Sequence, residues 1–341
     1  MIRKIPLTEA VGTRLAHDIT EIRPGEFKGP AFSQGHLVCE ADLCRLQRLG
    51  KNHLYVIELE EDEIHENEAA ALLAAALAGE GVVWEDQPKE GRINLYAGHD
   101  GLLVVDTVAL AAFNLIDEVM CATLHSHTLV RKGELVAGTR AIPLVMKRAV
   151  IERAAAIARQ HGAVLRVLPL RAAKGGIVIT GNEVFHGLIP DRFAPILEAK
   201  LRHLGAEVLG VSFAPDDAAQ IAGAIRAHLE AGCTLILVSG GMSVDPDDVT
   251  RQGILQAGAT EINYGAAVLP GAMFLCAYLG EVPVLGVPAC ALHHPVTVLD
   301  LVLPRVLAGE RVGKRELALL GHGGLCRHCP ECHYPRCSFG K

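Results

Sequence analysis

The sequence predicts an α/β fold: a three-layer α/β/α domain with a mostly parallel sheet, preceded by a smaller α+β domain and followed by a short cysteine-rich tail. The central domain is predicted by a pattern that recurs between Gly175 and Pro288: an apolar strand, a loop rich in acids and glycine, and an amphipathic helix. Strands that alternate with helices of this length are typical of a parallel sheet. The tail is predicted by four of the ten cysteines, which lie in the last sixteen residues.

Apolar periodicity and glycine stops predict the elements of the central domain. They are strands over 176–179, 207–211 and 234–238, helices over 191–204 and 217–231, a hairpin of strands 273–278 and 282–285, and a final helix over 291–307.

Three segments of the chain differ in their patterns of apolar, acidic and cysteine residues, and we expect them to be separate domains. They are an N-terminal α+β domain over 1–172, the ligand-binding domain over 173–310 and a metal-binding tail over 311–341. In the first of them we expect helices over 67–78 and 149–161 and strands over 102–106 and 164–168.

Composition limits the classes of function. Aromatic residues make up 4% of the chain and the formal net charge is −7, which disfavours a nucleic-acid partner because single-strand binders need stacking rings and positive charge. The apolar runs are too short to span a membrane, and the N-terminus has no signal peptide. We therefore expect a cytoplasmic protein that does not bind membranes.

The first three predicted strands end at loops that carry carboxylates, namely 180–183, 214–217 and 239–248. The carboxyl ends of parallel strands meet at one edge of a sheet, where such sheets bind ligands. Adjacent glycines at 240 and 241 allow the backbone to approach an anion, and carboxylates suit magnesium when phosphates complete its shell. The loops predict a crevice for a phosphate-bearing ligand and a hard cation, whereas any single acid is also explained as a helix cap.

The residues of these loops, in their order along the chain, resemble one family. The segments are Thr180-Gly-Asn-Glu183, Gly187-Leu-Ile-Pro-Asp191, Pro215-Asp-Asp217, Ser239-Gly-Gly-Met-Ser-Val244, Asp248-Val-Thr250, Leu269-Pro-Gly271 and Pro283-Val-Leu-Gly-Val-Pro288. This set resembles the molybdopterin-binding domain of the MoaB/Mog type, which molybdopterin adenylyltransferases, molybdotransferases of the MoeA type and gephyrin share. The competence/damage-inducible proteins carry a relative of it.

The resemblance implies roles for these residues. It implies that Glu183, Asp216 and Asp248 are catalytic, and that Asp216 and Asp248 hold Mg²⁺ beside molybdate and the pterin. It further implies that molybdopterin is contacted by Thr180, Gly181, Asn182, Ser239, Gly240, Gly241, Ser243, Pro270, Gly271 and Pro288.

Two loops depart from the molybdotransferase pattern. Ala272-Met273 stands where Lys-Pro usually follows Pro-Gly, which removes a cation, and Val287-Pro-Ala-Cys-Ala291 stands for Leu-Pro-Gly-Asn-Pro. Because Ala289 adopts a positive φ only at a cost, we expect the second loop to have another shape. The N-terminal match is limited to Ile5–Ile19, so no catalytic residue is transferred from that segment.

The tail carries four thiols within twelve residues, Cys326, Cys329, Cys332 and Cys337. Their two consecutive two-residue gaps are similar to one arm of a bacterial ferredoxin that binds a [4Fe–4S] cluster. Zinc usually takes two separated Cys-x2-Cys pairs. The spacing favours iron–sulfur over zinc, and a tail with free thiols is the alternative.

The leading hypothesis is a molybdopterin-binding protein of molybdenum cofactor biosynthesis, a homo-oligomer whose reaction would be magnesium-assisted insertion of molybdenum into adenylylated molybdopterin. A second hypothesis is a non-catalytic carrier or sensor that docks onto a molybdoenzyme or another cofactor-assembly protein. A third is a nucleotide pyrophosphatase of the competence-protein type, which Asp247-Asp-Val-Thr250 favours.

Overall fold

The computed structural model describes residues 2–23, 26–57, 59–160, 162–242 and 248–341. The chain divides into two compact units. The N-terminal unit comprises Met1–His99, Val105–Leu124 and Arg131–Val167, and the C-terminal unit comprises Asp100–Val104, His125–Val130 and Leu168–Lys341.

The C-terminal unit is built on one six-stranded sheet of order β15-β14-β16-β19-β18-β17. The first four strands in this order run parallel, whereas β18 and β17 complete the sheet in antiparallel pairs. The mostly parallel sheet and the hairpin predicted from the sequence are confirmed. The strands are β14 (Lys174–Thr180), β15 (Glu207–Ala214), β16 (Leu235–Ser239), β17 (Thr260–Tyr264), β18 (Leu275–Leu279) and β19 (Val282–Val287).

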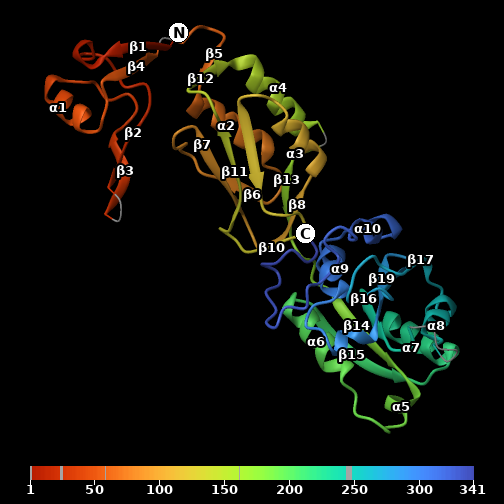
Figure 1. The fold of residues 1–341 in the computed structure, drawn as a ribbon. Helices are drawn as coiled ribbons and strands as arrows, with labels where there is room; N and C mark the ends of the chain where they lie inside the picture. Colours follow the sequence, from red (N-terminus) through yellow and green to blue (C-terminus); the bar gives the residue numbers. More distant parts are fainter. Residues whose placement is uncertain (1, 24–25, 58, 161, 243–247) are drawn as a thin grey trace. The chain divides into compact units, whose positions relative to one another are not determined.

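Helices cover both faces of this sheet (Figure 1). Ile177 and Ile179 of β14 share a buried cluster with α6 (Phe193–His203) and α9 (Val298–Leu307). Val178 lies between them in sequence and packs in a second cluster with α7 (Ala218–Glu230) and α8 (Thr250–Gln256). Because successive side chains of a strand point to opposite faces, this alternation produces the three layers that the sequence predicts.

The last helix begins later than expected. A short 3-10 helix η2 (Ala289–Leu292) follows β19, and α9 starts only at Val298. Pro295 lacks a backbone N–H, and Thr297 with Asp300 forms a capping box that begins the helix after it. Residues 314–319 form a further short helix, α10 (Lys314–Leu319).

Two early segments fold with the C-terminal unit. β8 (Gly101–Val105) pairs antiparallel with β10 (Leu129–Val130). This arrangement brings His127 to within 3.7 Å of Glu310, between Nε2 and a carboxylate oxygen.

The N-terminal unit is α+β. Its first part surrounds a small core that includes Ile5, Ile19, Phe32 and Leu46. A four-stranded antiparallel sheet, β6-β7-β11-β9, forms the second part. The elements are β1 (Ile2–Pro6), η1 (Leu7–Glu9), β2 (Ile19–Arg23), β3 (Phe27–Phe32), α1 (Glu40–Arg48), β4 (His53–Ile57), β5 (Glu63–His65), α2 (Glu66–Leu77), β6 (Val82–Trp84), β7 (Arg92–Ala97), α3 (Thr107–Asn114), β9 (Val119–Thr123), β11 (Leu135–Ala141), β12 (Val145–Lys147), α4 (Arg148–Arg159) and β13 (Leu165–Leu168).

Candidate functional site

The loops that follow β14, β15 and β16 lie side by side at one edge of the sheet. Thr180 is the register partner of Ala214, and Ile179 is the partner of Ser239. The short helix α5 (Asn182–Phe185) starts directly after β14. The parallel register therefore gathers the loops that carry the predicted site residues.

Asn182 and Asp216 join the first two loops through a pair of reciprocal hydrogen bonds. The backbone N–H of Asn182 donates to the Asp216 carboxylate at 2.9 Å, and the N–H of Asp216 donates to the Asn182 side-chain oxygen at 3.1 Å. Between β14 and α5, Gly181 has φ +133°, a conformation that favours glycine. These contacts hold Asp216 beside Asn182, as the sequence predicts for one crevice.

The loop after β16 packs tightly against the end of β14. The buried Thr180 hydroxyl donates to the Ser239 carbonyl and lies 2.9 Å from the Thr250 hydroxyl at the start of α8. Gly240, with φ +90°, approaches so closely that a Cβ atom would lie 2.3 Å from the Thr180 carbonyl oxygen. Gly241, with φ +51°, would bring a Cβ to 2.6 Å from Thr250 Oγ1. Only glycines fit at positions 240 and 241. We call this backbone, with Thr180 and Thr250 packed against it, the glycine cradle; Thr250 was not among the predicted site residues.

Ser239 has an unusual environment for a hydroxyl group. Its side chain is fully buried at the end of β16, and its Oγ has no hydrogen-bond partner in the described part of the chain. Leaving a buried hydroxyl unpaired costs about 1–3 kcal/mol, so such groups usually have a functional explanation. A ligand that reaches this loop can supply the missing partner.

We expect Ser239→Ala to separate stability from ligand binding. Removing an unpaired hydroxyl should leave the free energy of unfolding unchanged or raise it by about 1 kcal/mol. Ligand affinity should fall about tenfold if the hydroxyl bonds to the ligand. Urea denaturation and titration of the ligand measure the two quantities. In the control, Thr250→Val removes a hydroxyl that has a partner, and it should destabilise the protein by about 1 kcal/mol; equal destabilisation by both variants would contradict the assignment.

The predicted acids do not form a cation site within the described residues. No group of three His, Cys, Asp or Glu side chains in that part of the chain is arranged to hold a metal ion. Asp216 is engaged with Asn182, and the Glu183 carboxylate lies near Gly181. Asp216 and Asp248 therefore belong to no such three-residue group among the described residues, and the Mg²⁺ expected there stays a prediction. Ser243, Asp245 and Asp247 lie outside the described residues.

Pro270, Gly271 and Pro288 lie at the same edge of the sheet, after β17 and β19. Gly271 has φ +129°, and a Cβ there would meet Val298 at 2.4 Å. Pro288 precedes η2, in which Ala289 has no positive φ. Burial raises the pKa of the neighbouring Cys290 thiol, which disfavours the thiolate form that binds metals.

The cysteine tail packs on the C-terminal unit. Cys326 and Cys337 contact the core that includes α6 and α9, and Phe339 is 4% exposed within it. The backbone N–H of Cys326 donates to the Leu269 carbonyl at 2.8 Å. Among the described residues the four thiols do not converge as ligands of a single ion.

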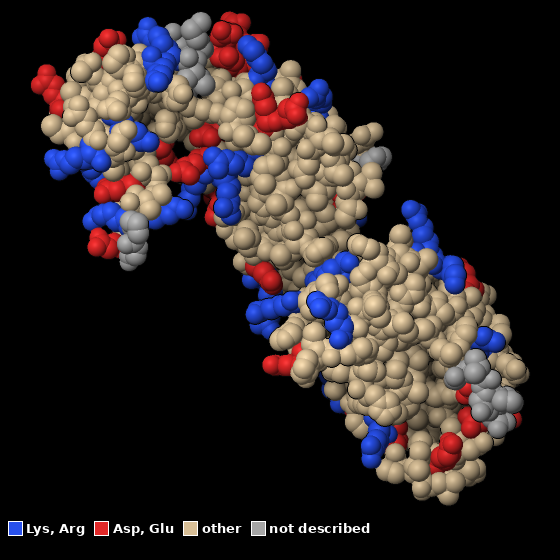
Figure 2. Space-filling view, in the orientation of Figure 1, with Lys and Arg blue, Asp and Glu red and all other residues tan. Residues whose placement is uncertain are grey.

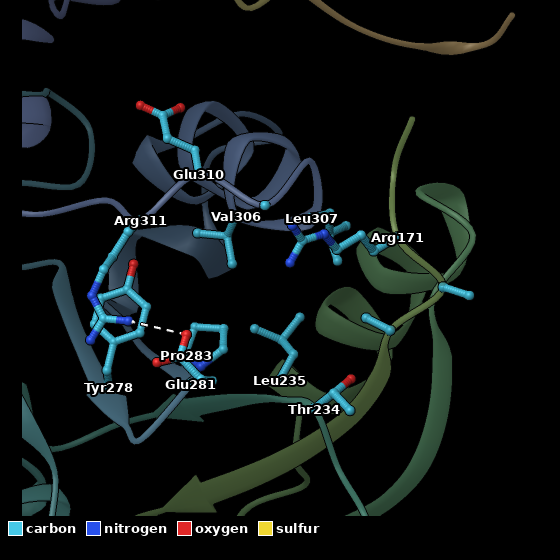
Figure 3. Close-up of a pocket in the computed structure, with 13 residues that line it drawn as sticks. Arg171, Thr234, Leu235, Tyr278, Glu281, Pro283, Val306, Leu307, Glu310 and Arg311 are labelled. Atoms are coloured by element: carbon cyan, nitrogen blue, oxygen red, sulfur yellow. Dashed lines mark ion pairs between the residues drawn. The ribbon is translucent and has the colours of Figure 1, made fainter. Parts of the chain in front are cut away.

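A cavity of about 330 Å³ lies at the opposite edge of the sheet, where β16 and β19 begin (Figure 3). Leu235, Pro283 and Val306 give it apolar walls, and Arg171 and Arg311 stand on two sides, with Arg311 3.5 Å from Glu281. None of the predicted site residues that the structure describes lines this cavity. Figure 2 shows acidic and basic side chains interspersed over the visible face of the C-terminal unit, without one dominant basic patch. None of the described helices is long and apolar enough to cross a membrane.

The fold and the loops define a class of protein domain: a three-layer α/β/α unit with a glycine-lined crevice at the carboxyl edge of a mostly parallel sheet. Residues 176–308 match the family model described as a probable molybdopterin binding domain, the MoaB/Mog type that the loop residues resemble. Residues 4–58 match a domain of unknown function, and the resemblance to MoeA is not confirmed.

Relatives at the sequence level are CinA-like proteins. Those of Mycobacterium tuberculosis (strain H37Rv) and Mycobacterium leprae are 39% and 38% identical over 79 residues, which are 23% of this chain. The one from Mycolicibacterium vanbaalenii is 34% identical over 97 residues, or 28% of this chain. This chain spans only 18%, 18% and 23% of the length of these relatives.

Similar solved structures include two molybdopterin biosynthesis proteins. The enzyme MoaB from Thermus thermophilus is 19% identical, with a TM-score of 0.34, over 40% of this chain and 98% of that chain. The Mog protein from Mycobacterium ulcerans is 23% identical, with a TM-score of 0.34, over 40% of this chain and 99% of that chain.

Proposed function

We propose that the C-terminal unit binds molybdopterin at the carboxyl edge of its sheet and acts in molybdenum cofactor biosynthesis. The observation that carries the proposal is the cradle of Gly240 and Gly241 beside the buried hydroxyl of Ser239, which has no hydrogen-bond partner in the part of the chain that the structure describes. Backbone in this conformation leaves amides free to face an anion, and the hydroxyl lacks a partner that a ligand can provide. The family match of residues 176–308 supports a pterin phosphate as that ligand.

Each residue of the crevice has a role in this proposal. The amides of Gly240 and Gly241 bind the phosphate, and Thr180, Gly181, Asn182 and Ser239 contact the pterin. Glu183, Asp216 and Asp248 position the reacting groups, and Pro270, Gly271 and Pro288 border the ligand farther along the edge. Ser243 is a proposed contact outside the described residues.

A transferase reaction is the catalytic form of this proposal. Molybdate would be the substrate that enters the pterin dithiolene, with one molybdate oxygen leaving as water. A second water would cleave the P–O–P bond of the adenylylated pterin, which leaves the pterin phosphate and AMP. No step is assigned to a magnesium ion. Glu183 and Asp216 at the crevice would accept hydrogen bonds from the attacking water and orient it.

Two observations favour a second candidate, a non-catalytic carrier that passes the pterin to a molybdoenzyme or another assembly protein. Ala272 and Met273 supply no cation beside Gly271, and Ala289 lies in η2 rather than in a glycine turn. Binding without turnover needs neither feature. In both candidates we propose a homo-oligomer, whose order light scattering of the purified protein would give.

Binding is tested by titrating the full chain with molybdopterin and following ligand retention by ultrafiltration. We expect one pterin per chain, with affinity lowered in Asp216→Ala, because that variant removes the acceptor of the Asn182 amide. In the control, Glu230→Ala changes an exposed acid at the far end of α7 and should bind as the unaltered protein does. No binding by the unaltered protein would overturn the proposed function.

Turnover is tested by incubating adenylylated molybdopterin, molybdate and magnesium with the protein and following AMP. Release of AMP above background supports the transferase, whereas bound pterin without AMP supports the carrier. The CinA-like relatives motivate a third arm with ADP-ribose. Release of AMP from ADP-ribose, without molybdopterin binding, would indicate a nucleotide pyrophosphatase instead.

A further inference from the structure

A second pocket in the C-terminal unit gathers every cysteine of the tail. Cys326, Cys329, Cys332 and Cys337 all line one cavity of about 340 Å³. The cavity is closed on another side by His294, which lies in the loop between η2 and α9. Four of the ten cysteines of the chain thus face a common space with an imidazole group from a distant segment.

Histidine side chains bring further donor atoms to this cavity. His328 also lines it, and its ring lies against that of His294 with 5.0 Å between the centroids. The loop at 293–296 is itself held in place, because Lys200 of α6 donates to the Pro295 carbonyl at 2.9 Å. Thiolates and imidazoles are the ligands that soft and borderline transition metals prefer.

The backbone around Cys326 places an N–H group against its sulfur. The N–H of His328 donates to the Cys326 sulfur at 3.5 Å, and His328 has φ +50°, a left-handed turn that is uncommon outside glycine. A hydrogen bond to the charged form of a group stabilises that form, and hydrogen bonds to sulfur tune metal–thiolate centres. The turn at His328 therefore supplies a backbone donor of the kind found around metal-bound sulfur.

Charge in the segment agrees with this interpretation. Residues 326–341 contain three basic side chains, Arg327, Arg336 and Lys341, and one acid, Glu331. Four thiolates around a divalent ion or a [4Fe–4S] cluster carry excess negative charge, which nearby cations offset. Cys329 and Cys332 are exposed, so an ion or a cluster can reach them from solvent.

From these observations we propose that the pocket of Cys326, Cys329, Cys332 and Cys337 is a thiolate-ligated metal centre, with His294 and His328 at its border. The proposal does not rest on pterin binding, although Cys326 is hydrogen-bonded to Leu269, which precedes the proposed pterin contacts Pro270 and Gly271. In the structure the thiols stand at the wall of the cavity and, within the described residues, do not converge on one point. The segment from Cys326 to Lys341, described throughout, forms no helix or strand, so its side chains can close on the metal when it binds.

The cavity between the four cysteines favours an iron–sulfur cluster over a single metal ion. Zinc draws four sulfurs to about 2.3 Å from one centre, whereas a cluster is bound at its periphery and fills a cavity. The two consecutive two-residue gaps between the first three cysteines are the spacing of a cluster-binding arm.

The test uses the full chain purified without oxygen. Iron, acid-labile sulfide and zinc are measured by elemental and colorimetric analysis, and Co²⁺ is titrated into protein stripped with a chelator. We expect one centre per chain and, with Co²⁺, the intense charge-transfer bands of tetrahedral thiolate coordination. Iron with sulfide identifies a cluster and zinc identifies a single ion; both support the thiolate centre, and the absence of iron, zinc and Co²⁺ bands overturns it.

Two double variants test which cysteines bind the metal. C329S/C332S should lower metal content about tenfold or more, whereas C39S/C44S, which changes two exposed cysteines of the N-terminal unit, should retain it. Circular dichroism checks that both variants fold, and removal of the metal should lower the Tm of the unaltered protein but not that of C329S/C332S. Full metal content in C329S/C332S would contradict the assignment.

Discussion

Gly240→Ala is expected to abolish ligand binding at the carboxyl edge and to destabilise the C-terminal unit. The new Cβ would lie 2.3 Å from the Thr180 carbonyl oxygen and 2.6 Å from its hydroxyl oxygen. One of these contacts is with backbone, so the loop has to move. A non-glycine residue at φ +90° adds about 1–2 kcal/mol of strain, and forced repacking adds about 1–3 kcal/mol.

Affinity for molybdopterin should fall more than about tenfold, which corresponds to about 1.4 kcal/mol, because the amides of Gly240 and Gly241 no longer face the ligand. Gly223→Ala provides the matched control: Gly223 is exposed on α7, and a Cβ there meets no atom within 4 Å. That variant should gain about 0.5–1 kcal/mol from helix propensity and bind normally. If Gly240→Ala binds molybdopterin with unchanged affinity, the glycine cradle is not part of the binding site.

Arg305→Ala should destabilise the C-terminal unit by about 3 kcal/mol, because it leaves a half-buried carboxylate without its partner. Arg305 is 4% exposed, and its guanidinium binds Glu310 through two hydrogen bonds of 2.7 and 2.6 Å. Such a bidentate pair is among the strong charge-assisted contacts of proteins. The effect should exceed that of Arg202→Ala, which removes an exposed pair with Glu198 worth about 0.3–0.5 kcal/mol.

The loss of stability caused by Arg305→Ala should depend on pH. Burial alone would raise the pKa of Glu310, but the hydrogen bonds and charge of Arg305, with the charge of His127, lower it below its usual value. A carboxyl group whose pKa is lowered on folding stabilises the folded state above its unfolded pKa, and this contribution disappears as the pH falls through the folded pKa. Urea denaturation should therefore show a large difference between Arg305→Ala and the unaltered protein at neutral pH and a smaller one in acid. A difference that grows in acid would contradict the role of the pair.

Local patterns predicted most elements of the C-terminal unit because each element buries one apolar face. β-Branched runs at 176–179 and 234–238 became strands in the middle of the sheet, and amphipathic spacing at 217–231 became α7. The predicted start of the last helix was wrong. Apolar periodicity continues through 291–297, but Pro295 and the Thr297 cap make the helix begin at Val298. Helix boundaries depend on caps, which periodicity does not measure.

The sequence by itself determined the strand–loop–helix repeat, the mostly parallel sheet and the shared edge at which Thr180, Asp216 and Ser239 meet, because apolar period and parallel register are properties of short segments. Only the tertiary structure decided which of these side chains are satisfied. It paired Asn182 with Asp216 and left the Ser239 hydroxyl without a hydrogen-bond partner among the described residues. It also brought His294 to the four cysteines. Contacts of this kind join residues far apart in the chain, and their geometry is set by packing, which the order of residue types does not encode locally.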